Sequence, residues 1–305
     1  MLEIPDPRDE GNKMIVIEND WLKVGIASNG AEVRKVKHKK NDLDYMWTGD
    51  NAYWGRVSPV LFPIVGRLKD DRYQLDGKTY KMSQHGFLRD VDFEVDEQTT
   101  TTVSFVFESA GRFIHIYPYE FKAIIRYVLQ EDSLIVQWEI VNENKEEMYF
   151  SIGAHPAFKL PLVENETIED YSLHFTPAAN KDVMEYELIN ALIHEKGKAN
   201  DLSTIQLAPS LFAHDALVYS NIDQIKLVSN KSSHAIEVIF EKFPFVGIWS
   251  KYMESNGTIA PFVCIEPWYG IADIYYESGN LKEKFGVNML ETGETFQAEY
   301  KMKFK

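Results

Sequence analysis

Alternation of apolar and polar residues with a period of two constrains the fold of this chain more than any other feature. The last ten residues show it most plainly. Their apolar side chains are Phe296, Ala298, Tyr300, Met302 and Phe304, and their polar ones are Gln297, Glu299, Lys301, Lys303 and Lys305. Because successive side chains of a strand point to opposite faces of a sheet, this period predicts a strand with one buried and one solvated face.

Similar runs recur along the chain, and turn-forming residues separate several of them. We predict three strand–turn–strand units: Phe121–Gln130 with Ser133–Val141, Tyr73–Leu75 with Thr79–Lys81, and Ala235–Phe240 with Val246–Ser250. The first is joined by Glu131-Asp132 and the second by Asp76-Gly77-Lys78, in which Asp-Gly strongly favours a tight turn. The third is joined through Lys242-Phe243-Pro244. Two further strands are predicted at Thr102–Glu108 and at Phe262–Glu266, and the second ends at a proline.

Helical patterns are scarce in this sequence. Leu281–Val287 and Ala208–Ala213 are each long enough for one or two turns, and Val183–Ile193 has no clear period. The 305 residues exceed the length typical of one domain, but no repeat, low-complexity segment or Pro/Gly/Ser-rich linker divides them. We therefore predict one all-β domain over residues 1–305. It should be mostly antiparallel, either a sandwich or a barrel-like pair of sheets, with few short helices.

The charge balance excludes two classes of partner. The chain has 32 Lys and Arg residues against 47 Asp and Glu residues, which gives a formal net charge of −15. A protein this acidic would neither neutralise nucleic-acid phosphates nor be attracted to an anionic membrane surface. The basic cluster from Arg34 to Lys40 has no interleaved aromatic residues, so we interpret it as a solvated turn.

The single cysteine, Cys264, excludes an internal disulfide and a metal site built from cysteines, and it is compatible with a reducing compartment. The segment Met1–Lys13 is polar and contains two prolines, so it lacks the apolar core of a signal peptide. No apolar run reaches the ~20 residues that a membrane helix needs. We therefore expect a cytoplasmic protein that has no membrane partner.

Three segments place polar groups in apolar surroundings that are rich in Gly and Pro. They are Ser58–Arg67 together with Gln84–Arg89, then Ser151–Phe158, and then Cys264–Asp273. His85, His155 and Glu266 thereby lie among apolar residues rather than on charged faces. Burial raises the pKa of a carboxyl group and can tune that of an imidazole, so these three residues are candidates for acid–base chemistry.

Structural roles stay open for each of these residues. A histidine beside Gly or Pro is commonly a hydrogen-bonded structural group, and this applies to both His85 and His155. Glu266 has no charged neighbour in the sequence, and an unpaired buried carboxylate is costly, so function is about as plausible as structure there. Arg67 and Arg89 could simply be its ion-pair partners.

Taken together, these segments resemble the aldose 1-epimerase (mutarotase) family. The motifs occur in the family's order: Phe-Pro-Ile-Val-Gly-Arg (62–67), His-Gly-Phe-Leu-Arg (85–89), Gly-Ala-His-Pro-Ala-Phe (153–158) and Ile-Glu-Pro-Trp-Tyr-Gly (265–270). The chain resembles more narrowly the bacterial branch associated with lactose operons, and it shares His-Gly-Phe-x-Arg with hexose-6-phosphate mutarotases. It departs from galactose mutarotases in which an aromatic residue and Asn-Leu follow the second histidine, because Pro-Ala-Phe follows His155 here.

The resemblance implies a large antiparallel β-supersandwich and roles for six residues. His155 matches the family's general acid, and Glu266 matches its general base. Asp215, in Phe-Ala-His-Asp-Ala-Leu, matches a hydroxyl-binding aspartate. The implied substrate-binding residues are Arg67, His85, Arg89 and Asp215.

The implied reaction interconverts the α and β anomers of a hexose. One proton must leave the C1 hydroxyl and another must reach the ring oxygen, so an acid and a base suffice, and we expect no metal or other cofactor. Matched pKa values are expected, because each group acts as both acid and base in one turnover. Trp54, Trp249 or Trp268 is available to stack on the apolar face of the sugar.

Other functions stay open beside this one. A catalytically silent carbohydrate-binding module on the same scaffold would need no acid–base pair, and a lyase or glycosidase would be expected to use two carboxylates or a Tyr/Arg arrangement. A hexose-6-phosphate mutarotase would use Arg67 or Arg89 to hold the phosphate through bidentate hydrogen bonds. The sequence identifies neither the hexose, nor its phosphorylation state, nor the oligomeric state.

Overall fold

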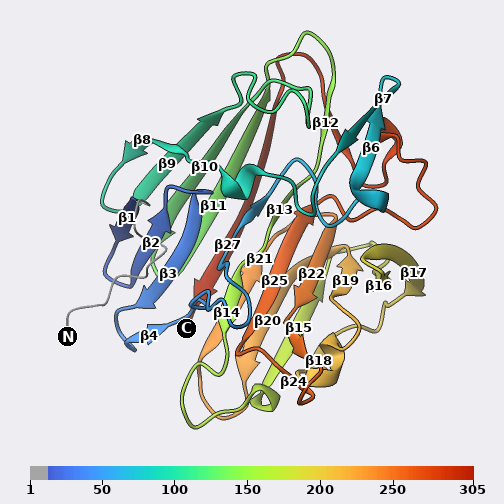
Figure 1. Ribbon diagram of the computed structural model, residues 1–305. Coiled ribbons are helices and arrows are strands. Elements are labelled where there is room, and N and C mark those ends of the chain that lie inside the picture. Colours follow the sequence, from blue (N-terminus) through green and yellow to red (C-terminus); the bar gives the residue numbers. More distant parts are fainter. Residues whose placement is uncertain (1–12) are drawn as a thin grey trace.

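The computed structural model describes residues 13–305, and most of the regular structure within them is antiparallel β-strand (Figure 1). The all-β prediction is therefore confirmed. Nearly all of the polar segment Met1–Lys13, on which the absence of a signal peptide was predicted, lies outside the described residues. Within the described residues, no helix is both long enough and apolar enough to span a membrane.

The larger sheet within residues 13–305 has nine strands in the order β18-β15-β20-β21-β27-β11-β10-β9-β8. Every neighbouring pair is antiparallel. Its strands are β8 (Glu94–Gln98), β9 (Thr102–Glu108), β10 (Phe121–Gln130), β11 (Ser133–Asn142), β15 (Tyr171–Pro177), β18 (Thr204–Gln206), β20 (Ile222–Ser229), β21 (Ala235–Ile239) and β27 (Thr295–Phe304).

The second large sheet of the described chain has the order β17-β16-β19-β22-β25-β13-β5, and β14 pairs with β25 beside β13. Its strands are β5 (Val60–Leu61), β13 (Ile152–Ala154), β14 (Ala157–Lys159), β16 (Met184–Ile189), β17 (Leu192–Lys198), β19 (Leu217–Ser220), β22 (Phe245–Trp249) and β25 (Phe262–Tyr269). Figure 1 shows β22 and β25 in front of β20 and β21 of the larger sheet.

Smaller sheets and short 3₁₀ turns surround these two sheets. One smaller sheet has four strands: β1 (Met14–Glu18), β2 (Leu22–Ala27), β3 (Glu32–His38) and β4 (Leu43–Asp44). Two-stranded sheets are formed by β6 (Arg72–Leu75) with β7 (Lys78–Lys81), by β12 (Met148–Phe150) with β26 (Asn288–Leu290), and by β23 (Tyr252–Met253) with β24 (Thr258–Ile259). The 3₁₀ turns are η2 (Lys69–Asp71), η3 (Leu88–Asp90), η4 (Ile168–Asp170), η5 (Pro209–Phe212) and η6 (Leu281–Glu283).

The core lies between the two large sheets. Along β27, Tyr300, Met302 and Phe304 are buried while the alternate residues are partly or fully exposed, as the period-two pattern predicts. Tyr269 of β25 contacts Phe296 of β27, with 5.0 Å between the ring centroids. Each such large side chain contributes about 1.5–3 kcal/mol when it is fully buried. Since both sheets share this core, we propose that the chain is one domain, as its sequence predicts.

Two predicted hairpins are confirmed, and the third is wrong. β10 pairs with β11, and β6 pairs with β7. β21 and β22 are both strands, but β21 pairs with β20 and β27 in the larger sheet, whereas β22 pairs with β19 and β25 in the other. The connection between β21 and β22 leads from one sheet to the other. Its Phe243 is buried in the core, with its ring centroid 4.6 Å from that of Tyr269.

Three further local predictions need correction or completion. The basic residues from Arg34 to Lys37 lie on strand β3, and only Lys39 and Lys40 lie in a turn. The segment around Val183–Ile193, which had no clear period, forms most of the hairpin of β16 and β17. The two predicted helical segments form only single 3₁₀ turns, η5 and η6.

Strand β25 also differs from the prediction, because it continues through Pro267 to Tyr269. Backbone N–H groups alternate between the two sides of a strand, and the N–H of Ile265 points to the carbonyl of Pro156. The position of the missing N–H of Pro267 therefore faces away from β22, so the ladder between β22 and β25 loses no hydrogen bond there.

Candidate active site

The two predicted catalytic residues are brought together by strand register. β13 pairs Gly153 with Trp268, and β14 pairs Ala157 with Cys264. Both pairings belong to one antiparallel register, so His155, between these strands, lies directly opposite Glu266 on β25. Directly opposed residues place their side chains on the same face of the sheet.

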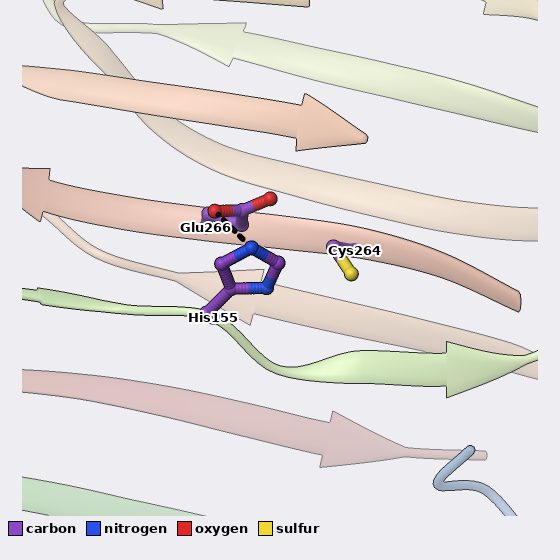
Figure 2. A group of neighbouring side chains, drawn as sticks. All are labelled: His155, Cys264 and Glu266. Atoms are coloured by element: carbon purple, nitrogen blue, oxygen red, sulfur yellow. Dashed lines mark ion pairs between the residues drawn. The ribbon is translucent and has the colours of Figure 1, made fainter. Parts of the chain in front are cut away.

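His155 and Glu266 form a close, buried pair. His155 Nε2 and Glu266 Oε2 are 3.2 Å apart, and the side chains are only 8% and 2% exposed (Figure 2). The Trp54 ring is stacked on the imidazole with 4.7 Å between the ring centroids. Trp249 meets the same imidazole edge-on at 5.8 Å. The aromatic rings therefore fix the imidazole plane, and one proton can pass between the two opposed groups.

Burial moves the pKa values of this pair in opposite directions. It lowers the pKa of His155 to about 3, with smaller effects from Arg89 and Arg56, because an imidazolium is poorly solvated here. It raises the pKa of Glu266 well above its usual value, and the charge of Asp215 adds to this. The Trp268 indole N–H partly opposes the shift, although it makes no hydrogen bond of ordinary geometry among the described residues. Matched pKa values were predicted, but burial separates those of His155 and Glu266.

The pair lies at a cavity of about 530 Å³ that is also lined by the four predicted substrate-binding residues. That volume is within the range of small-molecule sites. Trp54, Trp249 and Trp268, the predicted stacking residues, all line it as well. Residues from segments that are up to about 200 positions apart in the sequence thus meet at one site.

His85 is held in one defined tautomer. The backbone N–H of Gly66 donates to His85 Nδ1 at 3.1 Å, and the His85 N–H donates to the Gly66 carbonyl at 2.9 Å. A backbone N–H can only donate, so Nδ1 carries no proton and the neutral ring carries its proton on Nε2. Burial, with His155 and two arginines nearby, holds the pKa of His85 well below its usual value. His85 is therefore suited to donate a hydrogen bond.

Neither predicted arginine is the ion-pair partner of Glu266. Arg67 is about half exposed and makes two 2.7 Å hydrogen bonds to Asp71, which raise its pKa. Arg89 is mostly buried, and its Nη2 donates to the carbonyl of Gln84 at 2.8 Å. Burial, followed by the charge of Arg56, lowers the pKa of Arg89 to about 10. The partner of Glu266 is His155 instead.

Asp215 lines the cavity in a strained conformation. Its φ is 96°, and its Oδ1 accepts a hydrogen bond from the Ala216 N–H at 2.8 Å. Non-glycine residues rarely adopt positive φ, and such strain is concentrated at functional sites. Burial raises the pKa of Asp215. His85, with a φ of 67°, has the same kind of strain.

Trp268 lines the cavity, and its indole ring packs against a glycine on each of the two neighbouring strands. A Cβ at Gly247 would lie 2.3 Å from the Trp268 ring, and a Cβ at Gly153 would lie 2.6 Å from it. Real Cβ atoms do not approach other atoms so closely. The indole therefore occupies space that only glycine leaves open on β22 and β13.

Gly247→Ala is expected to destabilise the protein by about 1–3 kcal/mol, because the added methyl group overpacks the site around Trp268. Displacing this indole should also lower the activity. Urea unfolding, with tryptophan fluorescence as the signal, measures the loss. Gly25→Ala is the matched control, because its added Cβ would meet nothing closer than the flexible Met14 side chain at 3.3 Å. Equal stability of the two variants would contradict the argument.

Cys264 lies beside the pair, as Figure 2 shows. The nitrogen, sulfur and oxygen atoms of His155, Cys264 and Glu266 lie within 4.8 Å of one another. Burial, followed by the charge of Glu266, raises the pKa of the Cys264 thiol well above its usual value. The thiolate is the metal ligand and the nucleophile, so this buried thiol is suited to neither role.

Sequence reasoning missed several residues of the cavity wall. Lys251, Tyr252 and Glu254 follow β22 and line the cavity, but nothing in their pattern distinguishes them from an ordinary surface turn. Gln84 also lines the cavity. Its position next to His85, in the segment Gln84–Arg89, could have indicated this.

Comparisons with known proteins agree with this architecture. The family model described as aldose 1-epimerase matches residues 13–287. The protein LacX of Lactococcus lactis subsp. lactis (chromosomal form) is 30% identical over 297 residues, which cover 94% of this chain and 97% of LacX.

Two solved structures are similar over nearly their whole length. A galactose mutarotase related enzyme from Lactobacillus acidophilus is 36% identical with a TM-score of 0.91, covering 96% of this chain and 97% of that one. A galactose mutarotase-like protein from Lactobacillus casei ATCC 334 is 31% identical with a TM-score of 0.86, covering 96% of this chain and 100% of that one. The chain therefore belongs to the aldose 1-epimerase family, as its four motifs predict.

Proposed function

We propose that this protein interconverts the α and β anomers of a hexose, with His155 and Glu266 as its acid–base pair. One observation carries the proposal: a buried imidazole and a buried carboxyl group, 3.2 Å apart, line a cavity with aromatic walls. A site that only bound sugar would need neither the proximity nor the burial of two ionisable groups.

The pair can hold the one transferable proton that the reaction needs. Burial disfavours the two protonation states in which the pair has a net charge. These are the state with no transferable proton and the state with two. With one such proton, a neutral pair and an ion pair differ only in its position between Nε2 and Oε2. In the ion-pair form, the carboxylate of Glu266 is a base and the imidazolium of His155 is an acid.

The reaction follows from that form. The C1 hydroxyl gives its proton to Glu266, His155 gives its proton to the ring oxygen, and the bond between C1 and the ring oxygen breaks. Rotation about C1–C2 presents the other face of the aldehyde. Closure then runs in reverse: the hydroxyl formed from the ring oxygen returns its proton to His155, and Glu266 returns its proton to the C1 oxygen. Because both reacting oxygens are bonded to C1, two groups this close can serve them in one bound geometry.

The other predicted residues are proposed to hold the sugar. His85 offers its Nε2–H to a ring-side oxygen, and Asp215 accepts from a hydroxyl. The remaining guanidinium nitrogen of Arg67 contacts hydroxyls at the cavity edge. Trp249 and Trp268 have ring surface for the apolar face of a pyranose, whereas one face of Trp54 is covered by His155.

The pH dependence of kcat/KM is expected to be a broad bell with a plateau around neutral pH. Burial lowers the pKa for adding a second proton to the pair and raises the pKa for losing the last one. Activity should therefore fall on the acid side only below the ordinary imidazole range. Initial rates between pH 4 and 10 measure this, and a single transition at the usual pKa of histidine would contradict the shared-proton pair.

Polarimetry of freshly dissolved α-glucose and α-galactose tests the function directly. Catalysed approach to the equilibrium rotation is the expected result. Binding of these sugars without catalysis would instead identify a silent carbohydrate-binding module.

A specific observation favours a second candidate, a hexose 6-phosphate as substrate. Arg89 lines the cavity, and its buried Nε has no hydrogen-bond partner among the described residues. Its Nε lies 4.0 Å from Asp90 Oδ2, which is beyond hydrogen-bond distance, so this N–H is suited to a phosphate oxygen. Rates for glucose and glucose 6-phosphate separate the candidates, and Arg89→Gln should impair the phosphorylated substrate much more than the free sugar if the phosphate binds there.

A further inference from the structure

Asp273 and Lys284 form a buried ion pair behind the cavity wall. Lys284 Nζ and Asp273 Oδ1 are 3.0 Å apart, and each side chain is 3% exposed. Neither residue is among those that line the cavity within the described chain. Removing two charges from water offsets most of their attraction, so such a pair is weak evidence for stability and raises the question of what it positions.

Every polar atom of Asp273 has a partner, and two of these partners, Arg67 and Ile193, line the cavity. Its Oδ2 accepts from the Lys69 N–H at 2.9 Å, and its own N–H donates to the Arg67 carbonyl at 2.9 Å. Its carbonyl accepts from the N–H of Ile193, a lining residue of β17, at 2.8 Å. Lys284 Nζ also donates to the Ile271 carbonyl at 2.6 Å. The pair thus anchors the segment at residues 66–69 to the segment that follows β25.

The anchored segment is the one that sets the state of His85. Gly66 donates to His85 Nδ1 and accepts from the His85 N–H, as described above. Gly66 has a φ of 73°, and a Cβ there would lie 2.5 Å from the Cβ of Ala272, the residue before Asp273. The backbone at Gly66 therefore packs directly on the segment after β25 that carries Asp273.

We infer that Asp273 is a positioning residue: together with Lys284, it holds the segment at residues 66–69 so that the Gly66 N–H keeps His85 in its Nε2–H tautomer, facing the sugar. The functional part of this inference rests on the proposed function. If the segment shifts, Nδ1 loses its donor and both tautomers become populated. An Nε2 without its proton cannot donate to a sugar oxygen.

The first measurement does not depend on sugar turnover. In ¹⁵N-histidine NMR spectra at neutral pH, wild-type His85 should show an unprotonated Nδ1 and a protonated Nε2. Asp273→Asn removes the charge and should move both resonances toward a mixture of tautomers. The double variant Asp273→Leu/Lys284→Met replaces the pair by apolar side chains, which often preserves folding, and should show the same change.

The kinetic measurement follows the same logic. Both variants should raise KM by about tenfold, because the sugar loses one hydrogen bond. The effect on kcat should be smaller. In a His85→Gln background, the changes at Asp273 and Lys284 should raise KM no further, because the group they position is already gone.

A matched control separates positioning from stability. Glu166 is also a buried carboxylate; it accepts from the Ser229 hydroxyl at 2.6 Å and lies outside the cavity lining. Glu166→Gln should lower the melting temperature without moving the His85 resonances or KM. Folded Asp273 and Lys284 variants with wild-type His85 resonances would overturn the inference. Absence of anomerisation by the wild type would instead reject the proposed function and leave the NMR result standing.

Discussion

Glu266→Gln is expected to lower kcat by a factor on the order of 10² to 10⁴, which is the usual contribution of a general base. The amide retains the shape of the carboxyl group but cannot take the proton from the C1 hydroxyl. Substrate affinity should change much less, because the cavity wall is unaltered. Polarimetric kcat and KM on the purified variant measure both effects.

The control for this substitution is Glu166→Gln, which also neutralises a buried carboxylate but lies outside the cavity lining. It should retain wild-type kcat per folded molecule. Near-normal turnover in the Glu266 variant would remove Glu266 from the mechanism and leave it as the structural partner of His155.

His155→Gln is expected to reduce kcat by a comparable factor, on the order of 10² to 10⁴, with little change in KM. Glutamine can hydrogen-bond to a sugar oxygen but cannot deliver a proton to it. The aromatic rings of Trp54 and Trp249 still enclose the position, so the variant should remain folded. Melting temperature and anomerisation rate should be measured on the same preparation.

Two comparisons make the His155 result decisive. His85→Gln should weaken binding as well as slow turnover, because His85 is proposed to hold the sugar rather than transfer a proton. If His155 were only structural, its variant would lose stability while activity per folded molecule stayed unchanged. An unstable but fully active His155 variant would therefore contradict its assignment as the acid.

The strands with the clearest alternation could be predicted from the sequence, but partners that are distant in the sequence could not. The pattern at Phe121–Gln130 and Ser133–Asn142 includes a two-residue connection, so the pairing is local and the hairpin is confirmed. Between β21 and β22 the connection is also short, yet the strands join different sheets. Alternation reports which face of a strand is buried and carries no information about which distant strand pairs with it.

The site was predictable in its residue types and less so in its electrostatics. His85, His155 and Glu266 stand out because polar groups interrupt apolar sequence, and the structure places all three at one cavity. The sequence could not show that Asp71 holds Arg67 or that Arg56 and Arg89 lie near His155. These contacts form only on folding, and they add to the larger effect of burial on the pKa values.

The sequence by itself determined that this chain is built from strands with one apolar face, because side-chain alternation is a local property of the backbone. Its motifs also sufficed to predict the family. Only the tertiary structure decided that His155 lies opposite Glu266, through one register shared by β13 and β14 on β25. Only the tertiary structure also decided that the pKa values of His155 and Glu266 differ in this way. Residues distant in the sequence, including Trp54 and Trp249, pack around the pair and remove it from water.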